Sequence, residues 1–301
     1  MQTFQHFTCP AFGDRSQVVP PSLDIEFDDG GEELSRHPAA EDPLLIGKVF
    51  ELYQETLPRT PRALDYLRKR GLADPGVIEA FRIGFSDRTL GFRIPNARTP
   101  EGGAIRGQLQ RVGLLRPSGH ELFRGSLVFP VSDSEGNLVD AYGRKITYPL
   151  RRGTPYHVTL ADEPRWLCNG DALERSQDVI LCKSPLEAAT FWVARFRNVV
   201  ATLGLRAFSD ADLETFARNG TSRVYIAFDN TPGGDRAARL VAQTLSLIGT
   251  EALRIIFPHG MDANEFACAN GSPASAFAAL IRAARPFAQS YEGIREDSAW
   301  K

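Results

Sequence analysis

The stretch "VILCKSPLEAATFW" (Val179–Trp192) decides the fold class of the second half of this chain. Its apolar start is followed at once by Lys183 and Ser184, and Pro185 opens the next segment. An apolar run that ends at a capping residue with proline behind it predicts a strand leading into a helix. Glu187, three residues after the serine, predicts a capping box at the helix start. Such a strand end is where α/β folds place their chemistry, so the lysine has to be explained.

The same pattern of an apolar strand followed by a helix recurs toward the C-terminus. Strand-like runs occupy residues 198–204, 223–229 and 252–257, and helical segments occupy residues 209–220 and 233–249. Strict alternation predicts a parallel, Rossmann-like sheet with helices on both faces. The strands are nearly all apolar, which is typical of a sheet buried on both sides.

Residues 41–170 have a different pattern and are predicted to form a smaller α+β subdomain. Helical spacing dominates as far as residue 85, and extended segments are expected at 105–115, 124–146 and 155–160. The "DSEG" at 133–136 predicts a hairpin between two strands. The other expected divisions are a disordered acidic tail (1–40), the parallel-sheet domain (171–270), and a C-terminal helix and tail (271–301).

The charge distribution is uneven, although the 301 residues carry a net charge of only −2. Residues 1–47 hold nine acidic residues and two arginines, whereas residues 88–152 hold eleven basic and five acidic residues. A basic block of this kind suits a phosphate-bearing partner, although a solvated surface is the alternative. The four cysteines form no C-x-x-C pair, so we expect neither zinc nor disulfides, and no signal or membrane-spanning segment is evident. A cytoplasmic protein is expected.

Several segments, in this order, resemble the polymerase core and Toprim domain of bacterial DnaG-type primases. "TPRALDYLRKRGL" and "IEAFRIGF" are similar to the start of that core, and "FRGSLVFPVSDSEGNLVDAYGRKI" to its basic strand pair. "NVVATLG", "RVYIAFDNTPGGDRAA" and "GMDANEF" are similar to its Toprim half. The stretch between the helices and the strand pair is most similar to primase-like proteins of plasmids and other mobile elements.

The resemblance implies an acidic metal site, which this sequence matches only in part. Toprim enzymes place a glutamate after the first strand and Asp-x-Asp pairs after the third and fourth, to hold Mg²⁺. The candidate catalytic residues that remain are Glu187, Asp229 and Asp262, with the two aspartates as candidate metal ligands, while acids are replaced by Lys183, Thr231 and Asn264. A lysine about 4 Å from a divalent ion repels it by about 8 kcal/mol at an effective dielectric of about 20. We therefore expect Mg²⁺ binding to be weak or absent and the catalytic site to be degenerate.

The implied partner is single-stranded DNA or an RNA/DNA strand, with a replication protein as a further expected contact and no membrane. Arg124, Arg144 and Lys145 match the primase strands that lie along the template. Three alternatives stay open: an active primase in a split system, a Toprim nuclease, and a protein-interaction module. Glu187 could also be a simple helix cap, and Lys183 could hold an anion.

Overall fold

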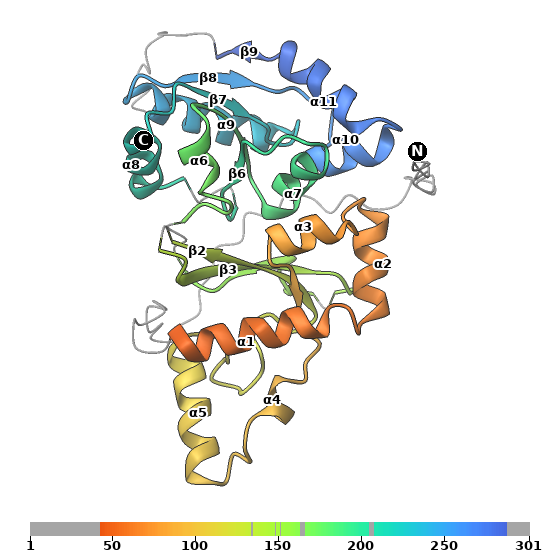
Figure 1. The fold of residues 1–301 in the computed structure, drawn as a ribbon, viewed down its shortest axis with the longest axis vertical. Coiled ribbons are helices and arrows are strands. Elements are labelled where there is room, and N and C mark those ends of the chain that lie inside the picture. Colours follow the sequence, from red (N-terminus) through yellow and green to blue (C-terminus); the bar gives the residue numbers. More distant parts are fainter. Residues whose placement is uncertain are drawn as a thin grey trace, which may run out of the picture.

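The chain is described by a computed structural model over residues 43–287, with gaps at 134, 148, 151, 163–165 and 205–207. The predicted acidic tail and the last residues of the chain lie outside these ranges. The described residues form two layers of structure stacked on each other, an antiparallel part and a part built on a mostly parallel sheet (Figure 1). No helix among them is long and apolar enough to cross a membrane.

The first part begins with three helices: α1 (Pro43–Thr56), α2 (Pro61–Lys69) and α3 (Pro75–Ala80). Proline stands at the first position of α2 and of α3, where its missing N–H leaves no hydrogen bond unmade. Gly71 follows α2 with φ of +68°, a conformation that glycine adopts without strain. The sequence therefore fixes where these helices start and turn.

The antiparallel sheet of the first part has the order β1-β2-β3-β4. Its strands are β1 (Gly84–Phe85), β2 (Ser126–Ser132), β3 (Leu138–Lys145) and β4 (His157–Thr159). The hairpin predicted at "DSEG" joins β2 to β3, and Asp133 accepts the backbone N–H groups of Glu135 and Asn137 in its turn. The register pairs Arg144 with His157 across β3 and β4, which brings both side chains to the same face.

The prediction of a strand at residues 105–115 is wrong. Helix α5 (Pro100–Arg111) occupies most of this range, and a short helix α4 (Leu90–Arg93) precedes it. The Thr99 hydroxyl accepts the N–H of Gly102 at 3.1 Å, so a cap and an N1 proline define the start of α5. Ile105 and Leu109 are four residues apart and face the core, which is helical spacing. The short apolar runs around them favoured a strand instead.

The second part is a five-stranded sheet in the order β6-β5-β7-β8-β9, parallel except for β9. The strands are β5 (Asp178–Cys182), β6 (Val199–Ala201), β7 (Arg223–Ile226), β8 (Glu251–Arg254) and β9 (Arg285–Pro286). The helices are α6 (Ala172–Arg175), α7 (Pro185–Val193), α8 (Asp210–Arg218), α9 (Pro232–Ser246), α10 (Ala263–Ala269) and α11 (Pro273–Arg282). The Toprim-like α/β fold predicted for this half is confirmed.

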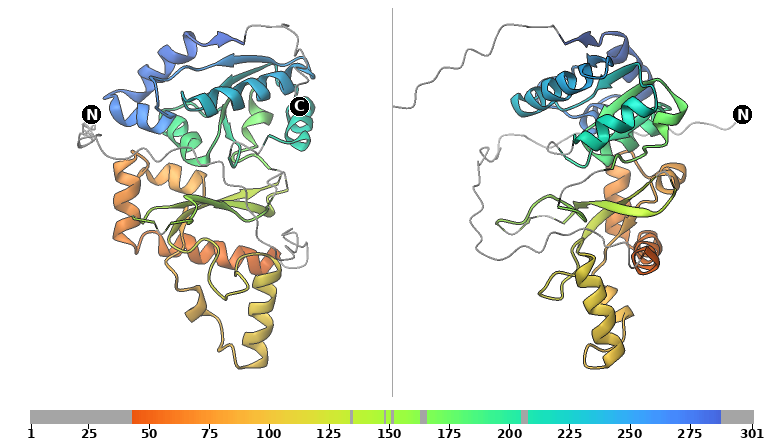
Figure 2. Two further views of the ribbon diagram at one scale, coloured as in Figure 1. Left: turned by 180° about the vertical axis from the view of Figure 1, so that it is seen from behind. Right: turned by 90° about the vertical axis from the view of Figure 1, so that its left-hand side faces the viewer.

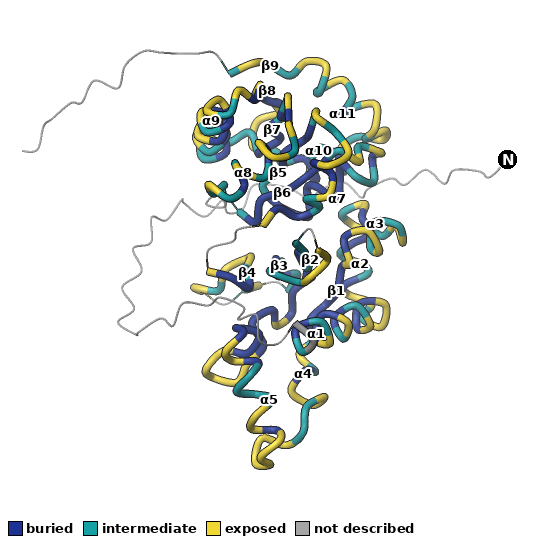
Figure 3. Tube along the Cα trace, turned by 60° about the vertical axis from the view of Figure 1, so that its left-hand side comes forward, coloured by how far each residue is buried: buried dark blue, intermediate teal, exposed yellow. Residues whose placement is uncertain are grey.

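Helices cover both faces of this sheet, as Figures 2 and 3 show. Successive residues of β5 point to opposite faces: Ile180 packs with α7, α10 and α11, while Val179 and Leu181 pack with α6, α8 and α9. The chain leaves β5 toward β6 on one side, and β7 lies on the other. The carboxyl ends of β5 and β7 therefore flank the switch point where ligands bind in such sheets.

The two parts share one apolar core rather than meeting at a loose joint. The buried cluster that contains Phe191 of α7 also contains Leu67 of α2 and Phe129 of β2. Phe81, just after α3, meets Trp192 edge to face with ring centroids 6.3 Å apart. The face of the antiparallel sheet is thereby held against the carboxyl edge of the parallel one (Figure 1).

Candidate functional site

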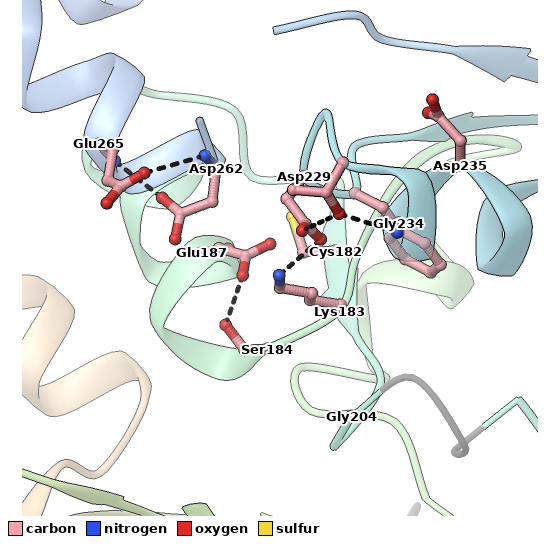
Figure 4. A network of polar contacts seen from close by, with 12 residues as sticks. Cys182, Lys183, Ser184, Glu187, Gly204, Asp229, Gly234, Asp235, Asp262 and Glu265 are labelled. Atoms are coloured by element: carbon pink, nitrogen blue, oxygen red, sulfur yellow. Dashed lines mark hydrogen bonds and ion pairs between the residues drawn. The ribbon is translucent and has the colours of Figure 1, made fainter. Parts of the chain in front are cut away.

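An ion pair occupies the switch point of the parallel sheet. Lys183 follows β5 and Asp229 follows β7, and the lysine Nζ lies 2.5 Å from Asp229 Oδ1 (Figure 4). The two side chains are 25% and 15% exposed, so water screens the pair only in part. Burial alone would raise the pKa of Asp229, but the Lys183 ammonium and the Thr231 hydroxyl hold it below its usual value. Burial opposes the charge on Lys183, yet Glu187 and Asp229 raise its pKa.

Thr231 connects this ion pair to the start of α9. Its hydroxyl donates to Asp229 Oδ2 at 2.7 Å and accepts the N–H of Gly234 at 3.0 Å. Thr231 is thereby the N-cap of α9. Both carboxylate oxygens of Asp229 consequently have a donor from the protein itself.

Glu187 lies beside the pair and is only 2% exposed. Its Oε1 accepts the Ser184 hydroxyl at 2.9 Å, and its Oε2 has no hydrogen-bond partner among the described residues. The pKa of Glu187 is raised to about 8, because burial and the charge of Asp262 raise it by more than Lys183 lowers it. The predicted capping box does not form, because the Ser184 side chain donates to the carboxylate instead of accepting a backbone N–H. Glu187 is thus a buried carboxyl group at the site rather than a helix cap.

Asp262 and Asn264 point in different directions. Asp262 caps α10, accepting the N–H of Glu265 at 2.8 Å, and its charge still reaches Glu187 and Lys183. Asn264 is fully buried and its amide bonds to the Arg70 carbonyl at 2.9 Å and to the Thr190 hydroxyl at 2.8 Å. The structure therefore brings Lys183, Glu187, Asp229, Thr231 and Asp262 together, whereas Asn264 joins the two parts of the chain.

Arg254 is a residue of this site that sequence reasoning missed. It ends β8, is 7% exposed, and donates from Nη1 to the carbonyl of Phe228 at 2.8 Å and from Nη2 to that of Asp229 at 3.0 Å. Its Nη2 also pairs with Asp235 Oδ1 at 2.9 Å. The signal was an arginine inside the apolar run "ALRIIF". Arg254 fixes the backbone that presents Asp229.

The antiparallel sheet presents a second group of side chains near the ion pair. The Nδ1 of His157 lies 3.1 Å from the Tyr142 hydroxyl and 3.3 Å from Arg144 Nη1. Burial, Arg144 and Lys183 together lower the pKa of His157 to about 4. Because Lys183 acts on His157, and Glu187 acts on Tyr142, the two groups are within electrostatic range of each other.

The three basic residues predicted to contact nucleic acid fall into two groups. Arg144 lies on the face of β3 with His157, whereas the next residue, Lys145, points to the opposite face. Lys145 is 8% exposed and donates to the Arg124 carbonyl at 2.5 Å. Burial, followed by Arg116 and Arg88, lowers the pKa of Lys145 to about 8. Arg124 itself is exposed.

The buried carboxyl group of Glu187 predicts a specific pH dependence of stability. A folded-state pKa of about 8, against about 4.5 when unfolded, means that the folded state keeps a proton that the unfolded state has lost. Stability should therefore fall as pH rises between these values, by up to about 1.4 kcal/mol per pH unit. Glu187→Gln should be more stable than the parent at pH 8, as measured by urea unfolding.

In the window from pH 6.5 to 8, the difference in slope between Glu187→Gln and the parent isolates this effect, because Lys145 and Glu121 contribute to both proteins alike. Asp140 and Asp212 have raised pKa values of about 6, and the pKa of His157 lies below its ordinary 6.5. None of these three groups therefore makes stability depend on pH above pH 6.5. Asp212→Asn is the matched control and should leave the slope in this window unchanged. Equal slopes for Glu187→Gln and the parent would contradict the placement of Glu187.

Comparisons with known proteins agree with this architecture. Residues 52–155 match the DNA primase catalytic core N-terminal domain, and residues 180–267 match a Toprim-like family. DNA primase of Aquifex aeolicus is 24% identical over 88% of this chain and 56% of its own length. DNA primase of Staphylococcus aureus (strain COL) is 28% identical over 90% of this chain and 46% of its own. The chain thus spans about half the length of the curated relatives it matches.

Solved structures give the same fold. The zinc-binding and RNA polymerase domains of Aquifex aeolicus primase superpose with a TM-score of 0.68 at 22% identity, over 81% of this chain and 61% of that one. A DnaG catalytic core superposes at 0.67 with 23% identity, over 81% and 80%. A DnaG primase catalytic domain bound to single-stranded DNA superposes at 0.66 with 22% identity, over 81% of each chain.

Proposed function

We propose that this chain, a relative of the DnaG-type primases built from their core N-terminal domain and a Toprim-like domain, binds single-stranded or primed nucleic acid without catalysing nucleotide transfer. The contact between Lys183 Nζ and Asp229 Oδ1 at 2.5 Å carries the proposal. An ammonium group in direct contact with the third-strand carboxylate supplies the positive charge that a metal ion would otherwise bring. The wider role would be in replication or maintenance of a mobile element.

The residues around Lys183 do not fit a Mg²⁺ ion. Such an ion needs near-octahedral oxygen ligands with ionised carboxylates among them. Asp229 has both oxygens engaged by Lys183 and Thr231, and Glu187 has a pKa near 8 that keeps it protonated at neutral pH. Asp262 uses one oxygen to cap α10. Glu187 Oε2 has no hydrogen-bond donor among the described residues, but it belongs to a carboxyl group that is protonated at neutral pH, so no metal-dependent step is assigned here.

The facing sheet supports a contact with a nucleic-acid backbone. Arg144 lies on β3 of the antiparallel sheet and Lys183 follows β5 of the parallel sheet, and both act electrostatically on His157. The Arg144 guanidinium suits a contact with a backbone phosphate, since single strands are bound mainly by charge. One solved relative of the same fold is bound to single-stranded DNA, which makes this ligand the first to test.

Arg144→Ala should weaken binding of single-stranded DNA and reduce its dependence on salt. Each phosphate contact on a single strand contributes about 0.7 to the slope of log K against log salt, because it releases condensed counterions. Fluorescence anisotropy of a labelled oligothymidylate between 50 and 300 mM KCl measures the slope, which should fall by about 0.7. The loss should be the same for oligonucleotides of other sequences.

Arg218→Ala is the matched control for this measurement. Arg218 is exposed and lies in the last turn of α8, next to the amino end of β7 and away from the switch point. Its removal should leave the slope unchanged. Equal effects of the two substitutions would mean that the basic residues act as a diffuse surface, and the Arg144 contact would be wrong.

An active primase is the second candidate, since Glu187, Asp229 and Asp262 all surround the switch point. In a split system, a partner subunit would act together with this chain in catalysis. This candidate requires the Lys183 ammonium to leave Asp229 when metal arrives. It predicts metal-dependent nucleotide incorporation, which the binding proposal does not.

A further inference from the structure

An apolar groove lies where α1, α2 and α3 meet, at one side of the antiparallel part (Figure 1). Its volume is about 460 Å³, and ligand clefts in proteins typically measure about 300–1,000 Å³. Leu57, Leu64, Ile78 and Ile83 supply the larger apolar side chains of its lining. None of the lining residues belongs to the switch point or to the three basic residues predicted to contact nucleic acid.

The rest of the described chain covers this apolar lining only in part. Leu64 and Ile78 are partly buried and pack on the edge of the shared core. Pro58 and Pro75, which also line the groove, are exposed. Apolar surface gathered in a hollow favours an apolar partner, because docking removes that surface from water.

The rim of the groove carries positive charge and a strained turn. Arg82 is exposed and has φ of +47°, a conformation that side chains rarely adopt. The side-chain amide of Gln54, another lining residue, donates to the Arg82 carbonyl at 3.1 Å and holds this turn. Among the described residues, neither Arg82 nor Arg59, which is exposed beside Pro58, forms a salt bridge. Glu79 also lines the groove, so two guanidinium groups and one carboxylate flank it.

The region of the chain before α1 contains a segment of matching chemistry. In residues 22–28, "SLDIEFD", the apolar residues Leu23, Ile25 and Phe27 alternate with acidic residues at 24, 26 and 28. Alternate side chains of an extended segment point to opposite sides. This sequence, when extended, therefore has an apolar side for the groove and an acidic side for the arginines at its rim.

We propose that residues 22–28 dock in this groove of the same molecule, with their apolar side chains on Leu64 and Ile78 and their acids near Arg82. Residues 29–42 link the segment to Pro43, the start of α1, and a link of this length spans up to about 50 Å. From Pro43 to the groove at Gln54, α1 rises by only about 17 Å. The segment can thus reach the groove, and the link raises its effective concentration there.

Photocrosslinking in the full-length chain tests this docking. p-Benzoylphenylalanine in place of Phe27 should crosslink, within one molecule, to peptides that contain residues 54–64 and 75–83. The same amino acid in place of Phe7 is the matched control, because Phe7 also precedes α1 but has no alternating acids around it. Crosslinks from Phe7 should not gather at the groove.

A charge reversal at the rim tests the role of the arginines. Arg82→Glu should lower the crosslink yield from Phe27 at least about fivefold, because it sets a carboxylate against the acids of the segment. Arg218→Glu, at an exposed arginine of α8, should leave the yield unchanged. Far-UV circular dichroism checks that both variants are folded.

Mixing isotope-labelled with unlabelled protein separates crosslinks within a molecule from crosslinks between molecules. Crosslinks that join two copies would make a second copy the occupant and overturn the assignment to the same chain. If Phe27 gives no more crosslinks at the groove than Phe7 does, the inference is wrong. Because the docking uses neither the switch point nor Arg144, either result leaves the proposed function to its own tests.

Discussion

Lys183→Glu combined with Thr231→Asp should make the chain bind Mg²⁺ more tightly than the parent does. The first change replaces an ammonium group by a carboxylate, and the second adds an acid two residues after Asp229. At about 4 Å and an effective dielectric of about 20, the lysine alone repels the ion by about 8 kcal/mol. Since 1.4 kcal/mol is a factor of ten in affinity, even a small part of this should tighten Mg²⁺ binding more than tenfold.

Isothermal titration calorimetry with MgCl₂ measures this difference directly. Lys183→Met is the matched control, because it removes the ammonium group without adding a ligand, and it should bind the ion only weakly. The helix starts should survive in the double variant, since aspartate caps a helix as well as threonine does. A parent protein that binds Mg²⁺ as tightly as the double variant would show that Lys183 is no obstacle to the ion.

Lys183→Met should also destabilise the protein strongly. The substitution leaves Asp229 partly buried without its counter-ion, and removing one partner of a buried pair costs about 3–5 kcal/mol. Exposure of 25% and 15% favours the low end, so we expect the free energy of unfolding to fall by about 3 kcal/mol in urea at pH 7. The pKa of Asp229 is lowered in the folded state, so this stabilisation is present above its ordinary pKa and is lost as pH falls through the folded value.

Asp229→Asn added to the Lys183→Met variant is the control for this experiment. It removes the stranded charge while keeping the shape of the side chain and its acceptor for Thr231, so the double variant should recover much of the loss. If the losses of unfolding free energy caused by Lys183→Met and by Asp229→Asn simply add in the double variant, the two side chains have no interaction energy. The account of Lys183 as an internal cation would then be wrong.

The parallel sheet and its switch point could be predicted because their signals are local. Apolar strands followed by capped helices set β5 and β7, and parallel strands bring their carboxyl ends to one edge. This was enough to place Lys183 beside Asp229. Thr231 as the cap of α9 followed from the same pattern.

The rest depended on contacts between distant parts of the chain. The resemblance makes Asn264 a replaced metal ligand, yet its amide faces Arg70, which is 194 residues away in sequence. Strand alternation separates Arg144 from Lys145, but only the packing of the two parts decides which of them faces Lys183.

Extension of a preannealed RNA primer on a DNA template tests the central claim most directly, because it does not depend on how a primer is initiated. The protein should be present at a concentration that saturates the template, with Mg²⁺ or Mn²⁺ and all four ribonucleotides. The account predicts that the template is bound and that incorporation stays at the level of a protein-free reaction, because Lys183 takes the place of the metal at Asp229. Incorporation that requires the metal and disappears in Asp229→Ala would contradict it.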